Sequence, residues 1–380
     1  MLRFITTSLA ATALCACVEA RAADAIFANG FEPARWVMGY YVGYERNLYP
    51  TDAIDFDAVT HLMVGRARPL AGGALSHDYD IDDSNGPIWA HAAVDAAHAA
   101  GRKAILMVGG AGEIDGWRDA ASSTHRAAFV ANLLAAVDQF GYDGLDLDWE
   151  PLESFDQADF IALAQALRGA RAGLILTVPL GWINANFAGT PDPFLAQIAP
   201  LFERIDIMSY DMEWPADGWQ SWHSSALHGE TGTTPSSISS SVAYYLASGV
   251  PAAKLGIGSG FYGVCWHGVT APHQTPGSIV ASDGAFGYAK IMAGYYSAAA
   301  RQWDATAHVP YLSSPAGLGA QHCNFLSYED PQSLADKGAY AKANGLGGII
   351  IWTISQGYLA SQPLGQRDPL LEALRASYLQ

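Results

Sequence analysis

Acidic and apolar side chains alternate between Asp143 and Glu150, in the stretch DGLDLDWE. Because successive side chains of a β-strand point to opposite faces, Asp146, Asp148 and Glu150 would share one face of a strand here. Carboxyl groups that lie this close inside a protein raise one another's pKa. A carboxyl group that keeps its proton near neutral pH can act as a general acid, so the pattern predicts acid–base chemistry ending at Glu150.

Two other interpretations of this stretch remain. An amphipathic edge strand with a solvated acidic face would show the same alternation, although the flanking apolar run argues against it. An Asp-x-Asp pair can also bind Mg²⁺ or Ca²⁺, but no further set of ligands accompanies Asp146 and Asp148 in the sequence. We therefore expect neither a metal ion nor another cofactor.

The elements that must position these acids repeat one theme, a short apolar run followed by an alanine-rich, helix-like run. The runs expected to be strands are Val37–Tyr41, Val59–Val64, Ala104–Val108, Gly144–Trp149, Leu174–Val178, Ile205–Met208, Leu255–Ile257 and Gly348–Trp352. The helix-like stretches include Ile88–Ala100, Thr124–Phe140, Ser154–Ala172, Ile238–Ser248 and Pro331–Asn344. This alternation predicts an α/β fold, a closed (β/α)8 TIM barrel, with a doubly wound open sheet as the alternative. Barrel active sites lie at the carboxyl ends of the strands, where Glu150 is expected.

One interval is too long for a simple strand–helix unit. The segment Phe261–Tyr328, between the seventh and eighth expected strands, is therefore predicted to be an insertion within a barrel of residues 36–380. Cys265 and Cys323 lie near its two ends. In an exported protein two cysteines most simply form one disulfide, and two separate buried thiols are the alternative.

Residues 1–22 are typical of a secretory signal peptide, with Arg3 before an apolar stretch and Ala20-Arg21-Ala22 as a cleavage site. A retained anchor and lipid attachment at Cys17 are the alternatives. Residues 23–35 are expected to be a loose lead-in to the barrel. No later apolar run is long enough to span a bilayer, so the mature protein is expected to be soluble, extracellular and monomeric.

The composition narrows the class of partner. Acidic residues outnumber basic ones 37 to 20, and a net charge of −17 is a poor match for nucleic acid or an anionic membrane. The 11 Trp, 18 Tyr and 14 Phe are many for a chain with so little charge. Aromatic rings can hold the C–H faces of sugars, so a neutral carbohydrate is a better fit than a phosphate-bearing partner.

The stretch Asp143–Glu150 matches the DGxDxDxE signature of glycoside hydrolase family 18, the chitinases and their relatives, and the chain resembles that family through nearly its whole length. Other similar pieces follow in the family's order: Val37–Tyr41, Gly109-Gly110 of an SxGG element, Met208–Asp211 of an MxYD element, Gly258–Gly263 and Gly347–Trp352. Fragments between Trp303 and Tyr328 resemble the α+β insertion of one chitinase subgroup.

The resemblance implies a role for each acid. Glu150 would protonate the glycosidic oxygen and later act as the base, while Asp148 would turn between Asp146 and the substrate and hold its acetamido N–H. Family 18 uses no enzyme nucleophile, because the sugar's own N-acetyl oxygen attacks the reacting carbon. Tyr210 would keep that acetamido group in line, and Asp211 would hold the distorted sugar.

The same resemblance implies substrate-binding residues. Trp352 would form the floor under the reacting sugar, and Tyr40 would lie beneath the acidic cluster; for both, ordinary core packing is the alternative. Met208, Trp214 and Asp143 are further candidates for contact with substrate.

Two positions depart from the family pattern. Met107 occupies the place of the SxGG serine, which donates a hydrogen bond to the inner acids. A thioether cannot donate one, so Asp146 should be less stable as an anion and the pH optimum should move. Arg66 stands where the family often has an aromatic residue, and it either faces the cleft or reaches solvent.

The resemblance as a whole implies a secreted chitinase that cleaves β-1,4 links between N-acetylglucosamine units, with chitin or chito-oligosaccharides as its partners. A chitin-binding lectin on the same barrel is one alternative, but such relatives have usually lost the acid at the position of Glu150. An endo-β-N-acetylglucosaminidase of N-glycans is another, and the insertion Phe261–Tyr328 disfavours it.

Overall fold

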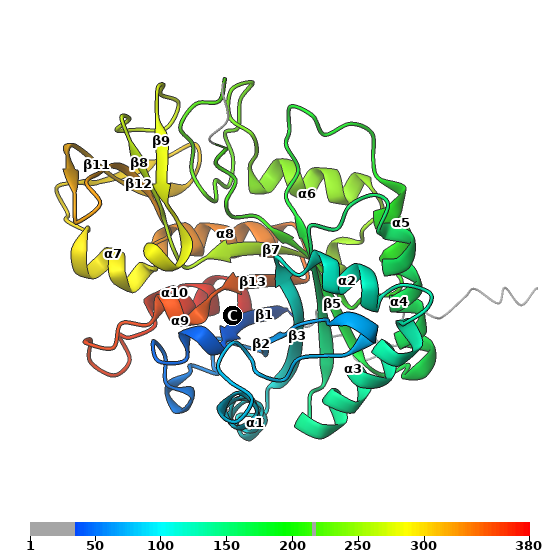
Figure 1. Cartoon of the computed structure of the whole chain (residues 1–380). Helices are drawn as coiled ribbons and strands as arrows, with labels where there is room; N and C mark the ends of the chain where they lie inside the picture. The colour runs from blue at the N-terminus through cyan, green and yellow to red at the C-terminus, as the bar shows by residue number, and fades with distance from the viewer. Residues whose placement is uncertain (1–34, 215–217) are drawn as a thin grey trace, which may run out of the picture. The chain divides into compact units, whose positions relative to one another are not determined.

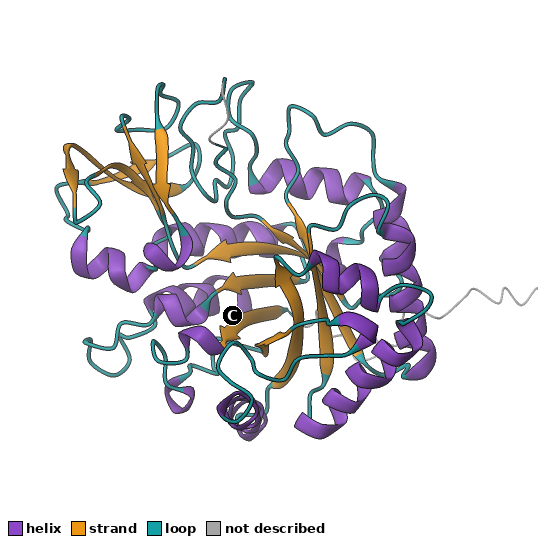
Figure 2. Cartoon of the chain, in the orientation of Figure 1, coloured by secondary structure: helices purple, strands orange, loops and turns teal. Residues whose placement is uncertain are grey.

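The computed structural model describes residues 35–214 and 218–380, and in these residues eight parallel strands close into a barrel, at the centre of Figure 2. The strand order around the barrel is β1-β13-β7-β6-β5-β4-β3-β2. The bounds are β1 Trp36–Val42, β2 His61–Ala67, β3 Lys103–Ala111, β4 Gly144–Glu150, β5 Ile175–Gly181, β6 Arg204–Met208, β7 Leu255–Gly260 and β13 Gly348–Trp352. Each predicted strand is confirmed, and closure of the barrel excludes the open sheet.

Helices surround the barrel, and those predicted from the sequence lie between the expected strands (Figure 1). The α-helices are α1 Asn85–Ala99, α2 Ile114–Ala120, α3 Arg126–Phe140, α4 Gln157–Ala170, α5 Pro193–Ile198, α6 Ile238–Ala247, α7 Tyr288–Gly294, α8 Pro331–Ala343, α9 Ile354–Gly357 and α10 Pro369–Leu374. Shorter helical turns are η2 Gly43–Glu45, η3 Thr51–Ala53, η4 Ala71–Gly73, η5 Ala252–Lys254, η6 Asp283–Ala285 and η7 Arg375–Leu379.

The alternation along the strands separates two buried clusters. Leu145, Leu147 and Trp149 of β4 belong to the large cluster between the barrel and its helices. Residues such as Met107 and Ile350 belong to a second cluster, which fills the inside of the barrel. The outward face of β4 is therefore anchored by apolar packing, which leaves its acidic face directed inward as the alternation predicts.

A separate antiparallel sheet lies between β7 and β13 in the sequence, and within the described residues it has five strands in the order β10-β11-β12-β8-β9. Its strands are β8 Val264–His267, β9 Ser278–Ala281, β10 Arg301–Asp304, β11 Val309–Leu318 and β12 Cys323–Ser327. The sheet and α7 lie beside the barrel, at the upper left of Figure 1. An insertion was expected here, and its bounds 261–328 and its subgroup stay a prediction.

A disulfide joins Cys265 of β8 to Cys323 of β12, with 5.3 Å between the two Cα atoms. Both residues are fully buried. The predicted pairing is confirmed, and the alternative of two separate thiols is wrong. The bond fixes two neighbouring strands of the inserted sheet.

The predicted signal peptide, residues 1–22, lies outside the described residues, as do Cys17 and all of the lead-in 23–35 except its last residue. In the two ranges that the structure covers, every helix falls short of the length and apolar character needed to cross a lipid bilayer.

Loss of the disulfide should destabilise the protein. The Cys265→Ala/Cys323→Ala variant is expected to lose roughly 2–5 kcal/mol of unfolding free energy, because the unfolded chain regains the freedom that the cross-link removes. Denaturant unfolding measures the loss. Peptide mapping of the wild-type chain without reductant should find the two cysteine peptides linked, and finding them separate would contradict the pairing.

Candidate active site

Strand β4 directs three acids into the barrel interior, one after another towards the carboxyl end of the strand. Asp146 is 1% exposed and Asp148 is 2% exposed, while Glu150 at the carboxyl end of the strand is partly exposed. Asp148 lies opposite Gly109 of β3, whose φ of 95° suits glycine. A Cβ atom there would lie 2.3 Å from the Asp148 carbonyl oxygen, so this close approach requires glycine.

Asp146 is held by two hydroxyl groups. Tyr40 donates to its Oδ2 over 2.7 Å, and Thr177 of β5 donates to its Oδ1 over 2.5 Å. Burial raises the pKa of Asp146 to about 6, although the hydrogen bonds from Thr177 and Tyr40 oppose this rise. Thr177 was not predicted as a site residue, although a lone polar residue in the apolar run Leu174–Val178 was a usable signal.

Among the three acids of β4, Asp148 is the one whose ionised form is disfavoured most strongly. Burial, followed by the negative charges of Glu150 and Asp146, raises its pKa well above the ordinary value. Its Oδ1 atom has no hydrogen-bond partner among the described residues. Burial also raises the pKa of Glu150, whereas a hydrogen bond with Asp148 lowers it. Each of the two carboxyl groups therefore holds its proton to a higher pH than an isolated acid would, and the pair can share a proton.

Tyr210 and Asp211 follow β6 and lie against the same space. Tyr210 is 8% exposed, and Asp211 takes the left-handed backbone conformation with φ of 52°. The Asp211 N–H donates to the Ser224 hydroxyl over 3.0 Å. Burial raises the pKa of Asp211 to about 6, and the negative charges of Asp283 and Glu150 add to the rise.

A hollow of about 170 Å³ lies at the carboxyl end of the strands, above the acids. It is lined by Tyr40, Ala111, Asp148, Glu150, Pro179, Met208, Tyr210, Asp211, Asp283 and Trp352. A hollow of about 620 Å³ adjoins it, shares Glu150 and Tyr210 with it, and reaches Trp182 and Trp214. A third, of about 440 Å³, shares Asp283 and Trp352 and reaches Tyr44, Arg66 and Asp80. We call these three hollows together the groove.

Aromatic side chains lie on both sides of Glu150 in the groove. Trp352 is partly exposed, and its ring centroid lies 5.5 Å from that of Tyr40. Trp214 is 48% exposed and packs edge-on against Trp182 at 6.2 Å. The structure thus brings Tyr40, Met208, Trp214 and Trp352 to the groove, as their expected role in binding requires.

Asp143 does not reach the groove, and its predicted contact with substrate is corrected. It precedes β4, about 20 Å along the strand from Glu150. Its carboxylate accepts hydrogen bonds from the Lys103 ammonium at 2.7 Å and the Ala104 N–H at 2.9 Å, and it lies 2.9 Å from the His98 ring. Asp143 therefore links the start of β4 to α1 and β3 at the amino end of the barrel.

The two departures from the family pattern lie beside the acids. Met107 is fully buried and pairs with Asp146 in the β3–β4 ladder, while its sulfur atom lies beside Gly65 and its terminal methyl group beside Gly110. Arg66 faces the groove and pairs with Asp80 at 2.8 Å and with Glu113 at 3.2 Å. Its charge lowers the pKa of both Asp148 and Glu150, against the larger effect of burial.

Asp283 is a groove residue that the sequence analysis did not identify. It lies in η6, within the inserted segment, and its Oδ1 atom accepts a hydrogen bond from Gln356 over 2.8 Å. No motif surrounds it in the sequence, so only the fold shows that this segment returns to the barrel.

Across residues 35–214 and 218–380, no group of three or more His, Cys, Asp or Glu side chains is arranged to hold a metal ion. The arrangement of the groove suits acid–base chemistry instead: a carboxyl group at its centre, raised in pKa, backed by a second that can share its proton.

Comparison with known proteins assigns the family. A family model described as "Glycosyl hydrolases family 18" matches residues 36–357. Chitinase A1 of Niallia circulans is 30% identical over 292 residues, which cover 67% of this chain and 40% of that protein. The Class V chitinase of Arabidopsis thaliana is 25% identical over 334 residues, which cover 80% of this chain and 82% of that protein.

Solved structures share the fold. The Group IV chitinase of Ostrinia furnacalis in complex with allosamidin has a TM-score of 0.74 at 24% identity, over 90% of this chain and 98% of that one. The chitinase-like agglutinin of Robinia pseudoacacia has a TM-score of 0.71 at 23% identity, over 90% and 99%. With the match spanning the barrel from its first strand to beyond its last, the chain belongs to family 18 of the glycosyl hydrolases.

Proposed function

We propose that this chain hydrolyses β-1,4 links between N-acetylglucosamine units of chitin or chito-oligosaccharides. The proposal rests on the inward row of carboxyl groups in β4, which ends with Glu150 inside the groove. Membership of family 18 and the similarity to chitinases support the substrate class. The chain spans 40% of the length of Chitinase A1, so the activity is proposed for the barrel described here.

Glu150 supplies the proton in the proposed first step. It protonates the glycosidic oxygen while the sugar's N-acetyl oxygen attacks C1, so the bond to the leaving sugar breaks and an oxazolinium ion forms. Water then adds to C1 and gives a proton to Glu150 while the ring bond between C1 and the N-acetyl oxygen breaks, which restores the acetamido group with retention of configuration. Asp148 is close enough to share a proton with Glu150, and once it turns towards the sugar its carboxyl group can accept a hydrogen bond from the acetamido N–H.

The other groove residues hold the sugar for this reaction. Tyr210 lies beside Glu150 and Asp211, where its hydroxyl can hydrogen-bond the acetamido carbonyl. Asp211 can accept a hydrogen bond from the distorted sugar, and Trp352 offers a ring face as its floor.

A chitin-binding lectin is the second candidate, because the Robinia pseudoacacia agglutinin shares this fold. Glu150 and both inner aspartates are present in this chain, which favours the enzyme. Product analysis on colloidal chitin, chito-oligosaccharides and a glycopeptide separates lectin, chitinase and N-glycan hydrolase.

Secretion is proposed from residues 1–22 alone, which have the charge and apolar pattern of a signal peptide. N-terminal sequencing of exported protein tests it, and a mature start near Ala23 is expected.

Glu150→Gln should lower kcat on a chitotriose reporter by about 10²–10⁴-fold, because the amide cannot donate the proton. Sugar binding should remain measurable by calorimetry. Glu153→Gln, which changes an exposed carboxylate nearby, serves as the matched control and should leave kcat unchanged. Full activity of Glu150→Gln would refute the assignment of the acid.

Tyr210→Phe should lower kcat by about 10²-fold, because the acetamido group loses the contact that keeps it in line. The unfolding midpoint should stay close to that of the wild type. Tyr244→Phe, which removes a hydroxyl bonded to the Thr190 carbonyl, is the control and should retain its rate. An unchanged rate for Tyr210→Phe would exclude its positioning role.

Arg66→Met should move the basic limb of the kcat/KM–pH profile to higher pH. The guanidinium lowers the pKa of Glu150, so its removal raises that pKa and keeps the acid protonated further up the pH scale. Arg66→Lys keeps the charge and should leave the limb near its wild-type position. A basic limb that does not move in Arg66→Met would show that the charge is not coupled to the acid.

A further inference from the structure

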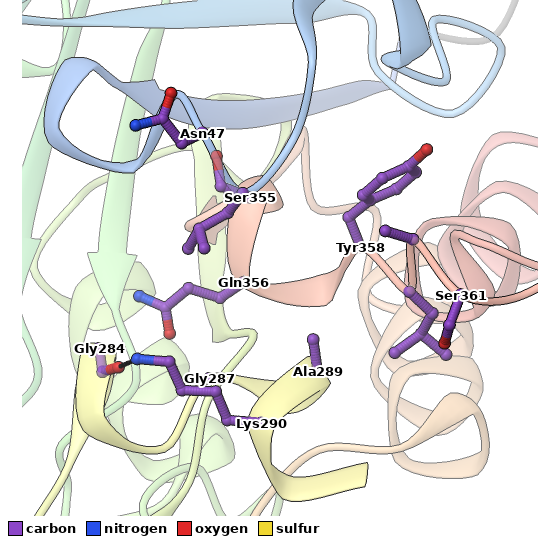
Figure 3. A pocket seen from close by; sticks show the side chains of 12 residues that line it. Asn47, Gly284, Gly287, Ala289, Lys290, Ser355, Gln356, Tyr358 and Ser361 are labelled. Atoms are coloured by element: carbon purple, nitrogen blue, oxygen red, sulfur yellow. Dashed lines mark hydrogen bonds between the residues drawn. The ribbon is translucent and has the colours of Figure 1, made fainter. Parts of the chain in front are cut away.

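Lys337 of α8 is a charged side chain that is fully buried inside the protein. Lysines are almost never fully buried unless they are paired. Lys290 and Lys342 show the usual situation, because both are exposed, and Lys290 lines the surface hollow of Figure 3. The contacts that offset the burial of the Lys337 ammonium show which part of the protein it holds.

Two contacts stabilise the Lys337 ammonium. It pairs with the carboxylate of Glu329, whose other oxygen atom accepts a hydrogen bond from Ser333 over 2.6 Å. It also donates a hydrogen bond to the Ser225 hydroxyl over 2.9 Å. Glu329 and Ser225 are buried as well, so the ammonium joins α8 to the segment between β6 and α6 inside the protein.

The ammonium fixes the direction of the Ser225 hydroxyl group. An ammonium group can only donate hydrogen bonds, whereas a hydroxyl group can donate one and accept others. Because Ser225 Oγ accepts from Lys337, its single hydrogen remains for the Ser209 carbonyl, to which it donates over 2.6 Å. The buried charge therefore acts, through one hydroxyl group, on the peptide group directly before Tyr210.

Ser224 holds the peptide group on the other side of Tyr210. Its hydroxyl accepts from the Asp211 N–H over 3.0 Å, and its carbonyl accepts from the Met212 N–H over 2.9 Å. We call Ser224 and Ser225 the serine clamp. The clamp fixes the backbone on both sides of Tyr210, and it includes the left-handed turn at Asp211.

The neighbouring strand β7 limits the Tyr210 ring in the same way. Ser209 Oγ donates to the Gly258 carbonyl over 3.0 Å and accepts from the Gly258 N–H over 2.8 Å, which joins the end of β6 to β7. A Cβ atom at Gly258 would lie 2.8 Å from the Tyr210 ring, so the ring packs directly against the backbone of β7. A shift of the clamped backbone would therefore displace the Tyr210 hydroxyl group.

We propose that Lys337 is a positioning residue, which acts through the serine clamp to hold Tyr210 and Asp211 in place for the reaction. The roles of Tyr210 and Asp211 rest on the proposed function, whereas the contacts of the clamp do not. The described lining of the groove includes neither Lys337 nor the clamp. Because a displacement of about 1 Å can lower a rate about 10²-fold, a residue outside the groove can still control kcat.

Ser225→Ala removes the link between Lys337 and Ser209 without removing a charge. We expect kcat on a chitotriose reporter to fall about tenfold or more, with KM within about twofold of the wild type, because only the transition state needs the aligned groups. Ser248→Ala is the matched control. It removes a buried hydroxyl that accepts from the Asp192 N–H over 3.0 Å, outside the described lining of the groove, and should leave kcat unchanged.

Lys337→Met/Glu329→Gln removes both charges together, so that neither is left buried without its partner. Without the ammonium, the Ser225 hydroxyl is no longer constrained to donate to Ser209. We expect kcat to fall about fivefold or more, while the unfolding midpoint stays close to that of the wild type. Lys342→Met, on an exposed position of the same helix, is the control and should retain its rate.

A double-mutant cycle shows whether the clamp acts through Tyr210. If it does, Ser225→Ala should lower kcat much less in the Tyr210→Phe background than in the wild type, because the hydroxyl group that it displaces is already absent. An equal loss in both backgrounds would overturn the proposal, since a purely structural effect does not depend on the Tyr210 hydroxyl. An unchanged kcat of Ser225→Ala in the wild-type background would overturn it too.

Calorimetry with chitobiose thiazoline, a stable analogue of the oxazolinium ion, separates this proposal from the proposed function. An active wild type whose clamp variants match it in kcat and in affinity would overturn the role of Lys337 alone. A wild type that binds the analogue but cleaves nothing would contradict the proposed function, and the affinity of Ser225→Ala would then decide the role of the clamp. A wild type that neither binds nor cleaves would overturn both.

Discussion

The structure depends on one costly arrangement, a row of carboxyl groups on the inner face of β4. Burying charged groups in a barrel is unfavourable unless they are hydrogen-bonded, neutralised or reached by an opposite charge. All three kinds of stabilisation are present in this barrel. Tyr40 and Thr177 donate hydrogen bonds to the innermost acid, burial raises the pKa of Asp148 and so favours its neutral form, and Arg66 brings a positive charge from β2. The outward leucines of the same strand, packed beneath the helices, hold this face in place.

The acids of β4 become more exposed towards the carboxyl end of the strand, and their surroundings differ accordingly. The innermost one has its hydrogen bonds satisfied and cannot approach a ligand, whereas the outermost one lies in the groove. Asp148 lies between them with one oxygen atom free, so it can respond to either neighbour. Charge couples the three groups, because Glu150 raises the pKa of both Asp146 and Asp148.

Short apolar runs followed by helix-like runs were enough to predict the barrel strands, and period-two alternation predicted the inward direction of the acids, because both patterns follow from local geometry. The disulfide could be predicted from the cysteine count and the expected export of the protein. Contacts between distant segments were harder to predict. The sequence marks Thr177 only as a lone polar residue in an apolar run and does not mark Asp283, and both reach the site because the barrel closes and the insertion returns to it. Asp143 was wrongly assigned because a sequence motif can extend over the full length of a strand and so include both ends of the barrel.

Asp283 gives the inserted segment a direct part in the electrostatics of the barrel. Its carboxylate adds to the rise in the pKa of Asp211, and Gln356 after the last barrel strand holds it in position. The insertion and the barrel are consequently not interchangeable modules. Grafting this insertion onto another barrel would therefore also transfer one of the charges of the groove. Shortening the inserted loop would change the pKa of Asp211, about seventy residues earlier in the chain.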